Sequence, residues 1–366
     1  MEERYIATIL LHALGDTIGF KNGEWEFNYD KNLITLDVTN EILYDFIDLG
    51  GINEIDLKDW NVSDDTIYHM AMIKALLRSS INLNNEMIEN IKEELAIAYN
   101  SIIDDEEKDI YRYPGVTTNK YIQEFANGYD GRTLPYDKNA GGNGAAMRTS
   151  CIGLAYSGKK NRKKLYEIAI ESSRITHNSA IGYLGGLTSA LFTAFAIENI
   201  DIIEWPFLLV KKLSSKTIKK FINNDQDEIN DYEKYIFYWQ KYIDLRFDNN
   251  KPIKTRAHKN LIFRSRFHYE NFTKDTGSFL IGESGYGATI MAYDSLLDAE
   301  YVWEKLIIYS ALHFGDGDTV AAIAASWYGA IYGLKYIPEK NLKYLEFKEE
   351  LIELSKKLYD RYYKLK

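Results

Sequence analysis

Apolar side chains recur at helical spacing along most of the chain. In the N-terminal segment, residues 4–14, they stand three and four positions apart, at Tyr5, Ile6, Ile9, Leu10, Ala13 and Leu14. This spacing places them on one face of a helix, which we expect to face the core and to end at Gly15.

The same spacing predicts helices in most of the remaining chain. The predicted ranges are 67–77, 95–103, 163–174, 178–197, 232–245, 290–297 and a helix from residue 320 onward. Alternation typical of a strand extends over a useful length only at residues 33–38, and residues 254–279 show no pattern that assigns them to an element. The sequence therefore predicts an all-α fold.

Two of these helices are predicted to be buried on all sides. Residues 178–197 approach the ~20 residues of a membrane span, but Thr188, Ser189 and Thr193 make them less apolar than such spans usually are. In residues 320–333, Ala, Gly and Ser occupy eight of fourteen positions, which lets neighbouring helices approach closely. We expect core helices here and no membrane partner.

Length and composition set the broad class. The 366 residues contain no linker rich in Pro, Gly or Ser, so we expect one domain, residues 1–366. The 54 acidic and 44 basic residues give a net charge of −10, which repels nucleic acid and argues against it as a partner. The N-terminus lacks a signal peptide's pattern, and the single cysteine, Cys151, excludes an internal disulfide. We expect a cytoplasmic monomer in which Cys151 is buried and unreactive.

The leading candidate for chemistry is the acidic segment that precedes residue 320. Gly315 and Gly317 allow a tight turn, so Asp316 and Asp318 can face one point ahead of the helix that follows. Their carboxylates and the Thr319 hydroxyl are oxygen ligands, which favour Mg2+, Mn2+ or Ca2+ over zinc. The alternative, which this pattern alone favours, is that Asp318 and Thr319 merely cap a core helix.

A second acidic segment precedes the helix predicted at residues 67–77. Ser63 is a natural N-cap and Asp64 and Asp65 stand in the first turn, so capping explains much of this pattern too. However, if the two acidic helix starts meet, four carboxylates share one small volume and repel one another. Only cations or protonation would make that arrangement tolerable.

Further loops contain residues suited to ligand binding. Residues 140–148 are rich in glycine and are expected to lead directly into a helix, an arrangement that can present backbone N–H groups to a phosphate. In the loop at residues 21–27, Glu26 stands between two aromatic residues, so the loop is either a lid or an ordinary exposed turn. His177 is equally a ligand contact or a structural histidine, and residues 282–287 suit the flexible rim of a pocket.

Taken together, these segments resemble the ADP-ribosylglycohydrolase family, and within it the ADP-ribosyl-arginine hydrolases. The matching segments follow the family's order along nearly the whole chain: Gly15-Asp16 with residues 22–27, Val62-Ser63-Asp64-Asp65-Thr66, residues 141–154, residues 176–185, Met291-Ala292-Tyr293-Asp294 and Gly315-Asp316-Gly317-Asp318-Thr319. Each segment alone is a weak signal, whereas all six in order are a strong one.

The resemblance implies an all-α, single-domain orthogonal helical bundle with two Mg2+ ions at its centre, which Mn2+ can replace. The metal ligands that it implies are Ser63, Asp64, Asp65, Asp316, Asp318 and Thr319, with Asp16 supporting them from nearby. The ADP-ribose contacts that it implies are Asn139, Ala140, Gly141, Gly142, Asn143, His177, Ser284, Gly285 and Tyr286.

The implied activity is Mg2+-dependent hydrolysis of the N-glycosidic bond between ADP-ribose and arginine in ADP-ribosylated proteins, with ADP-ribose as product. The implied catalytic residues are Asp64, Asp65 and Glu26. Hydrolysis builds positive charge at the anomeric carbon, and a Mg2+ pair can bind the ribose hydroxyls and acidify the attacking water. Asp65 or Glu26 can take the proton of that water.

Two departures from the family pattern leave the substrate open. Gly317 replaces the usual Ser or Thr between the last two aspartates without removing a ligand, and residues 285–289 lack the acid of the family's Gly-His-Asp-Ala-Pro segment. ADP-ribosyl-serine, poly-ADP-ribose and O-acetyl-ADP-ribose are therefore alternative substrates. A non-catalytic ADP-ribose-binding protein on the same fold is the contrasting alternative. A metal-dependent phosphohydrolase is more distant, because the six histidines form no ligand cluster in the sequence.

Overall fold

A computed structural model of the chain describes residues 1–25, 36–129, 133–223, 225–276, 278 and 280–364. The α-helices of its first half are α1 (Glu2–Phe20), α2 (Leu36–Asp48), α3 (Asp64–Arg78), α4 (Asn85–Glu106), α5 (Val116–Ala126), α6 (Ser150–Ala155), α7 (Arg162–Arg174) and α8 (Ala180–Ile197). Those of its second half are α9 (Trp205–Leu213), α10 (Lys216–Lys219), α11 (Gln226–Arg246), α12 (Leu261–His268), α13 (Gly285–Ala299), α14 (Trp303–Ala311), α15 (Gly317–Tyr332), α16 (Glu339–Lys343) and α17 (Lys348–Tyr359). The strands β1 (Phe247–Asp248) and β2 (Lys251–Pro252) pair antiparallel. The fold is all-α, as the periodicity predicts.

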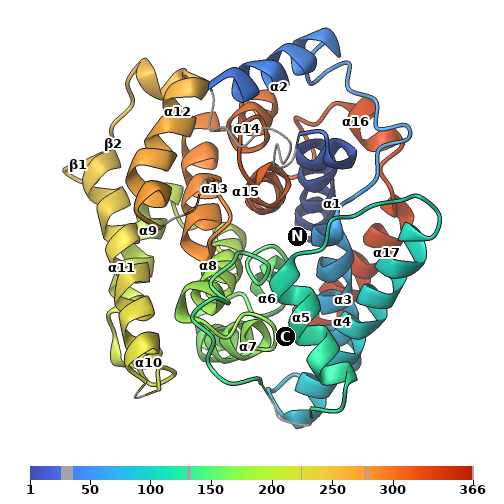
Figure 1. Ribbon diagram of the computed structural model, residues 1–366, viewed down its shortest axis with the longest axis vertical. Helices are drawn as coiled ribbons and strands as arrows, with labels where there is room; N and C mark the ends of the chain where they lie inside the picture. The colour runs from blue at the N-terminus through green and yellow to red at the C-terminus, as the bar shows by residue number, and fades with distance from the viewer. Residues whose placement is uncertain (26–35, 130–132, 224, 277, 279, 365–366) are drawn as a thin grey trace.

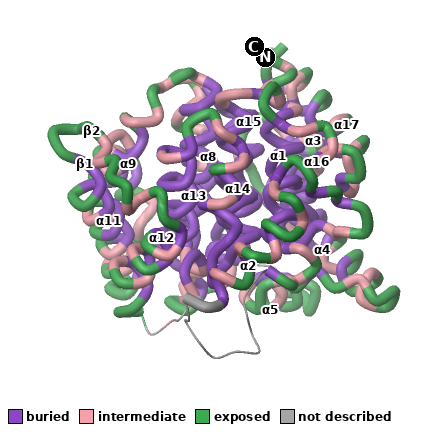
Figure 2. Tube along the Cα trace, turned by 90° about the horizontal axis from the view of Figure 1, so that it is seen from above, coloured by how far each residue is buried: buried purple, intermediate pink, exposed green. Residues whose placement is uncertain are grey.

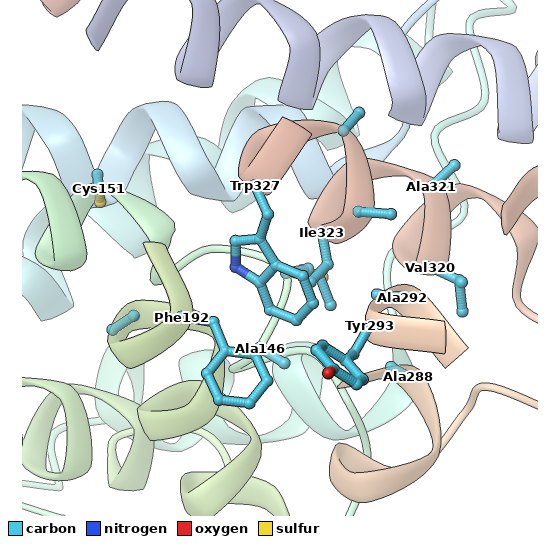
Figure 3. Close-up of a cluster of buried hydrophobic side chains, with 14 of the residues drawn as sticks. Ala146, Cys151, Phe192, Ala288, Ala292, Tyr293, Val320, Ala321, Ile323 and Trp327 are labelled. Carbon is cyan, nitrogen blue, oxygen red and sulfur yellow. The ribbon is translucent and has the colours of Figure 1, made fainter. Parts of the chain in front are cut away.

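Helices α1 and α15 form the centre of the bundle. They pack along each other, and α8, α13 and α14 pack against α15 (Figure 1). These central helices are buried along most of their length, whereas exposed residues gather on the outer helices (Figure 2). In the core, the Phe192 ring of α8 lies 5.2 Å from the Trp327 ring of α15 and 5.7 Å from the Tyr293 ring of α13, measured between centroids (Figure 3). These large rings join three helices into one core.

Gly15 does not end the first helix, contrary to the prediction from the sequence. Helix α1 continues through it to Phe20. A Cβ at Gly15 would lie 2.5 Å from the carbonyl oxygen of Ala321, and a Cβ at Gly19 would lie 2.5 Å from that of Gly317. Both glycines therefore mark places where the α1 and α15 backbones touch, which only a residue without a side chain permits. Asp16 consequently lies on a helix and not in a loop.

The other helix predictions are largely confirmed, with shifted ends. Helix α8 has the length and apolar composition of a membrane span, but all of it is buried inside the structure. The glycine-rich segment does not lead directly into a helix, because α6 begins only at Ser150. The described end of the strand-like segment, from Leu36, begins helix α2 instead, and helix α12 lies within residues 254–279.

Asp294 belongs to the motif at residues 291–294, one of the segments that resemble the family. Its side chain lies in a buried ion cluster. It accepts hydrogen bonds from Arg246 Nε at 2.7 Å, Arg264 Nη2 at 2.5 Å and the Tyr242 hydroxyl at 2.7 Å. Burial disfavours the charge, yet Arg264 and Arg246 hold the pKa of Asp294 well below its ordinary value. This motif residue therefore joins α11, α12 and α13, which is a structural role.

Gly15→Ala should lower the free energy of unfolding by about 1–3 kcal/mol, the usual cost of overpacking. In an open helix the same substitution would raise it by about 0.5–1 kcal/mol, so the sign reports the close contact of the two backbones. Urea denaturation gives the measurement. Gly115→Ala is the control, because a Cβ there would meet only the Thr118 hydroxyl, at 3.9 Å. A stabilised Gly15→Ala protein would contradict the close packing.

Candidate active site

The two acidic helix starts, of α3 and α15, meet in the structure, which is the condition under which the sequence places four carboxylates in one small volume. Ser63 caps α3 and accepts a hydrogen bond from the Asp65 N–H at 3.2 Å, and Asp316 caps α15 and accepts from the Thr319 N–H at 3.3 Å. Across the gap, the Thr319 hydroxyl donates to Asp65 Oδ1 at 3.2 Å. Capping is therefore real at both helices. Capping does not explain why the two helix starts meet, since each helix is capped by its own residue and does not need the other helix for it.

Asp16 of α1 joins Asp64, Asp65, Asp316 and Asp318, and we call these five residues the acidic junction. Asp16 also attaches the start of α3 to α1. Its carboxylate accepts hydrogen bonds from the N–H groups of Ser63 at 3.2 Å and Thr66 at 3.1 Å. The aspartate thus serves as a second cap for α3, supplied by another helix. The Asp16 side chain is fully buried, so it holds the junction from its inner side.

Five buried carboxyl groups repel one another in the junction. Burial raises the pKa of Asp16 to about 7, and the charge of Asp318 adds to the effect. Burial, followed by Asp318, raises the pKa of Asp64 and of Asp65 well above the ordinary value. Burial raises the pKa of Asp316, and burial together with Asp316 raises that of Asp318 further. The junction therefore needs protons or cations to balance its charge.

The donor atoms of the junction suit a hard divalent cation. Its side-chain ligands are all oxygens, which Mg2+ prefers. Asp65 Oδ2 is buried and has no hydrogen-bond partner among the residues described, a condition that a bound cation would relieve. Among all the residues that the structure describes, no three His, Cys, Asp or Glu side chains are already close enough together to hold a metal ion. The carboxylates would therefore have to draw together around the ion.

Asn143 joins the glycine-rich loop to the acidic junction. Its Nδ2 donates to Asp316 Oδ2 at 2.6 Å and to the Gly282 carbonyl oxygen at 2.9 Å. On the other side of the loop, the buried Arg148 donates to the carbonyl oxygen of Gly144 at 2.6 Å and to the Thr176 hydroxyl at 2.7 Å. The loop is thus held from both sides next to the carboxylates.

His177 lies against the same loop. A Cβ at Gly144 would lie 2.7 Å from His177 Cε1, so the ring fills the space that the glycine leaves open. Burial, and then the charge of Arg148, lowers the pKa of His177 to about 3, so the ring is neutral. Its Nδ1 lies 2.9 Å from the Thr176 hydroxyl oxygen. His177 therefore has a structural partner and also lines the cavity described next.

Two adjoining cavities open beside the junction. The central cavity, of about 320 Å3, is lined by residues that include Asp64, Asp65, Gly142, Asn143, His177, Asp316, Asp318 and Thr319. The outer cavity, of about 490 Å3, is lined by residues that include Lys138, Asn139, Gly141, Gly142, Lys234, Phe272, Ser284 and Tyr286. Gly142 and Glu283 line both, so one ligand can extend from the carboxylates into the outer cavity.

Other predicted site residues have different surroundings. Ala140 and Gly285 pack against α8: a Cβ at Gly182 would lie 2.4 Å from the Ala140 oxygen, and a Cβ at Gly285 would lie 2.1 Å from the Ile181 oxygen. Residues 285–287 are not a flexible loop, because they form the first turn of α13, which Ser284 caps. Glu26 lies outside the residues that the structure describes.

Several residues that shape the site were missed by the sequence patterns. Arg112 is almost fully buried; its Nη1 donates to the Val62 carbonyl oxygen at 2.7 Å and its Nη2 to Glu346 Oε1 at 2.8 Å. This clamp fixes the segment that leads into Ser63. Lys138 and Lys234 come from segments without a shared motif, and no local signal marks them as neighbours. Glu283, in contrast, lies within residues 282–287, which the sequence predicted to be a pocket rim.

Known proteins share both the sequence and the fold. The ADP-ribosylglycohydrolase family model matches residues 1–366. A proposed ADP-ribosyl glycohydrolase of Acanthamoeba polyphaga mimivirus is 41% identical over 362 residues, 96% of this chain and 67% of that protein. ADP-ribosylhydrolase ARH1 of Dictyostelium discoideum is 34% identical over 386 residues, 98% of this chain and 94% of its own. Human ADP-ribosylhydrolase ARH3 is 26% identical over 241 residues, 61% of this chain and 58% of its own. A solved structure described as an ADP-ribosylglycohydrolase-related protein complex covers 98% of both chains with a TM-score of 0.61 and 16% identity, a likeness of fold.

Without divalent cations, the contribution of the junction to stability should fall as the pH rises from about 4 to 7 and above. A carboxyl group whose pKa is raised on folding binds its proton more tightly in the folded state. Its contribution is therefore complete below the unfolded pKa of 3.8 and is lost as the pH passes the folded value, about 7 for Asp16. Urea denaturation in chelator should show wild type losing stability relative to Asp318→Asn, by up to about 1.4 kcal/mol per pH unit and proton. A difference that does not change with pH would refute the raised pKa values.

Proposed function

The chain belongs to the ADP-ribosylglycohydrolase family, and we propose that it is a Mg2+-dependent hydrolase that cleaves the bond between ADP-ribose and arginine in ADP-ribosylated proteins. The observation that carries this proposal is the acidic junction in the wall of the central cavity, which adjoins a larger cavity containing two lysines. N-glycoside hydrolysis needs charge stabilisation at the ribose, and recognition needs an adjoining space for the rest of the ligand.

The proposed metal site uses the residues of the two helix starts. Ser63, Asp64, Asp65, Asp316, Asp318 and Thr319 would hold two Mg2+ ions, or Mn2+ in their place. The ions would offset the carboxylate repulsion, orient the ribose hydroxyls and polarise the attacking water. Asp16 keeps Ser63 in position and Asn143 keeps Asp316 in position through the hydrogen bonds above. Asp65 would accept the proton of the water through a carboxylate oxygen that the ions leave free.

The outer cavity suits the ADP portion of the substrate. Lys138 and Lys234 supply positive charge for the diphosphate, and Phe272 and Tyr286 supply aromatic surface for the adenine ring. Glu283 lines both cavities, and burial raises its pKa. A raised pKa weakens the tendency of this carboxyl to ionise and so reduces its repulsion of the phosphates. ADP-ribosyl-arginine is the proposed substrate because the motifs resemble the arginine branch along nearly the whole chain.

Purified protein should release ADP-ribose from ADP-ribosyl-arginine, in preference to ADP-ribosyl-serine and poly-ADP-ribose, and only with Mg2+ or Mn2+ present. Product chromatography gives the measurement. Mg2+ should also raise the melting temperature, because it binds the folded state alone. Saturable ADP-ribose binding without hydrolysis would identify a binding protein. Chelator that alters neither turnover nor stability would refute the metal site.

Asp316→Asn and Asp318→Asn should each lower turnover by about 100-fold or more, since each removes an anionic group from the metal site. The apo variants should be at least as stable as wild type, because carboxylate repulsion is relieved and Asn still caps a helix. Asp294→Asn is the matched control: it should cost about 3–5 kcal/mol of stability by breaking the arginine cluster, with unchanged Mg2+ affinity. Parental turnover in either Asp316→Asn or Asp318→Asn at limiting Mg2+ would refute the proposed centre.

Lys234→Met should raise KM for ADP-ribosyl-arginine about tenfold with little change in kcat, because a charge-assisted contact to the diphosphate is lost. The salt dependence of KM should weaken in the same variant. Lys219→Met, at an exposed position on α10, is the control and should behave as wild type. Equal kinetics in the two variants would move the diphosphate away from the outer cavity.

A further inference from the structure

We propose that a third cavity, between α2 and the turn that joins α14 to α15, binds the guanidinium group of the arginine from which ADP-ribose is released. This Trp25 cavity has a volume of about 210 Å3, and its walls include Glu24, Trp25, Glu41, Asp45 and Phe314. The inference rests on the proposed function, to which it adds the site that recognises the leaving group.

The cavity wall already binds a cation of the chain itself. Lys21 Nζ forms ion pairs with the carboxylates of Glu24 and Asp45 and lies 5.1 Å from the centroid of the Trp25 ring. Trp25 Nε1 donates to Asp45 Oδ2 at 2.7 Å, which fixes the direction of that carboxylate. Carboxylates beside an aromatic face are the groups that recognise a guanidinium, through charge-assisted hydrogen bonds and cation–π contact.

The local charge of the Trp25 cavity favours a second cation. Glu24 and Asp45 share the single ammonium of Lys21, so this trio remains negative. Burial disfavours both charges, yet their contact raises the pKa of Lys21 and lowers that of Asp45, so both stay charged at neutral pH. The side chains of Asp45 and Glu24 are 41% and 67% exposed, so an incoming cation can reach them.

Two stretches of chain connect the Trp25 cavity to the acidic junction. Phe314, in the wall of the cavity, precedes Asp316 by two residues, so their Cα atoms are at most ~7 Å apart. Lys21 follows Gly19 by two residues, and a Cβ at Gly19 would lie 2.6 Å from Asp318 Cα. A group that leaves the ribose at the junction is therefore within a short distance of this cavity.

The cavities have opposite charges, which match the two ends of ADP-ribosyl-arginine. Lys138 and Lys234 line the outer cavity proposed for the diphosphate, whereas Glu24 and Asp45 line the Trp25 cavity. The arginine substrate has an anionic diphosphate at one end and a cationic guanidinium at the other, while the serine substrate has no charge on its leaving group. The polarity therefore favours arginine.

The direct test is titration of the whole chain with n-butylguanidine and with its neutral analogue of similar shape, n-butylurea, followed by ligand-observed NMR. Butylguanidine should bind saturably and butylurea at least about fivefold more weakly. Asp45→Asn should weaken butylguanidine binding about fivefold, whereas Lys21→Met should tighten it because the internal competitor is removed. Asp48→Asn is the matched control, an exposed aspartate on the same helix with the same change of charge. Equal binding of the two probes, or equal effects of Asp45→Asn and Asp48→Asn, would overturn the inference.

Kinetics separate this inference from the proposed function. Asp45→Asn should raise KM for ADP-ribosyl-arginine about fivefold and that for ADP-ribosyl-serine less than about twofold. Glu24→Gln repeats the test at a more exposed position if Asp45→Asn folds poorly. Hydrolysis of ADP-ribosyl-arginine with unchanged KM in both variants overturns the inference alone. Selective butylguanidine binding without hydrolysis of any substrate upholds the cation cavity and overturns the proposed function alone.

Discussion

Repulsion among five buried carboxylates is the constraint on which the rest of the structure depends. Asp16, Asp64, Asp65, Asp316 and Asp318 come from three helices, and all are buried at one junction. Burial weakens the screening of these charges by water, so protonation or a cation is needed to relieve their repulsion. The backbone contact of α1 with α15 at Gly15 and Gly19 keeps Asp16 close to Asp316 and Asp318. The junction therefore needs protons or cations to balance its charge, which is a property of a site and not of a core.

The surrounding residues keep each carboxylate in place against this repulsion. Both helix starts place their acids at the positive end of a helix dipole, which favours an anion there. Asp16 holds Ser63, Asn143 holds Asp316, and the Arg112 clamp holds Val62. Asp294 shows the opposite solution to the same problem. Arg246 and Arg264, which also pair with Asp298, keep it ionised, so it stabilises three helices and needs no added cation.

Charge also organises the space around the junction. The lysines of the outer cavity and the acids of the Trp25 cavity stand on different segments, and four of the five carboxylates line the central cavity, which adjoins the outer one. A substrate that is anionic at one end and cationic at the other would lie along this gradient with its ribose at the carboxylates. Such placement reduces the cost of orienting the scissile bond, since the charges at both ends select one direction of binding.

The sequence by itself determined the helices, the two capped acidic starts and the residue types of the proposed metal site. These signals are local, because apolar spacing, caps and acidic pairs are each encoded within a few neighbouring residues. The predictions failed where the contacts of a residue come from a distant part of the sequence. Gly15 reads as a helix stop until Ala321 is placed against it, and Gly285 reads as a loop until Ile181 is placed against it. Only the tertiary structure brought Arg112 to Glu346 and Asp45 to Lys21, because such contacts depend on how whole helices pack, which no short stretch of sequence encodes.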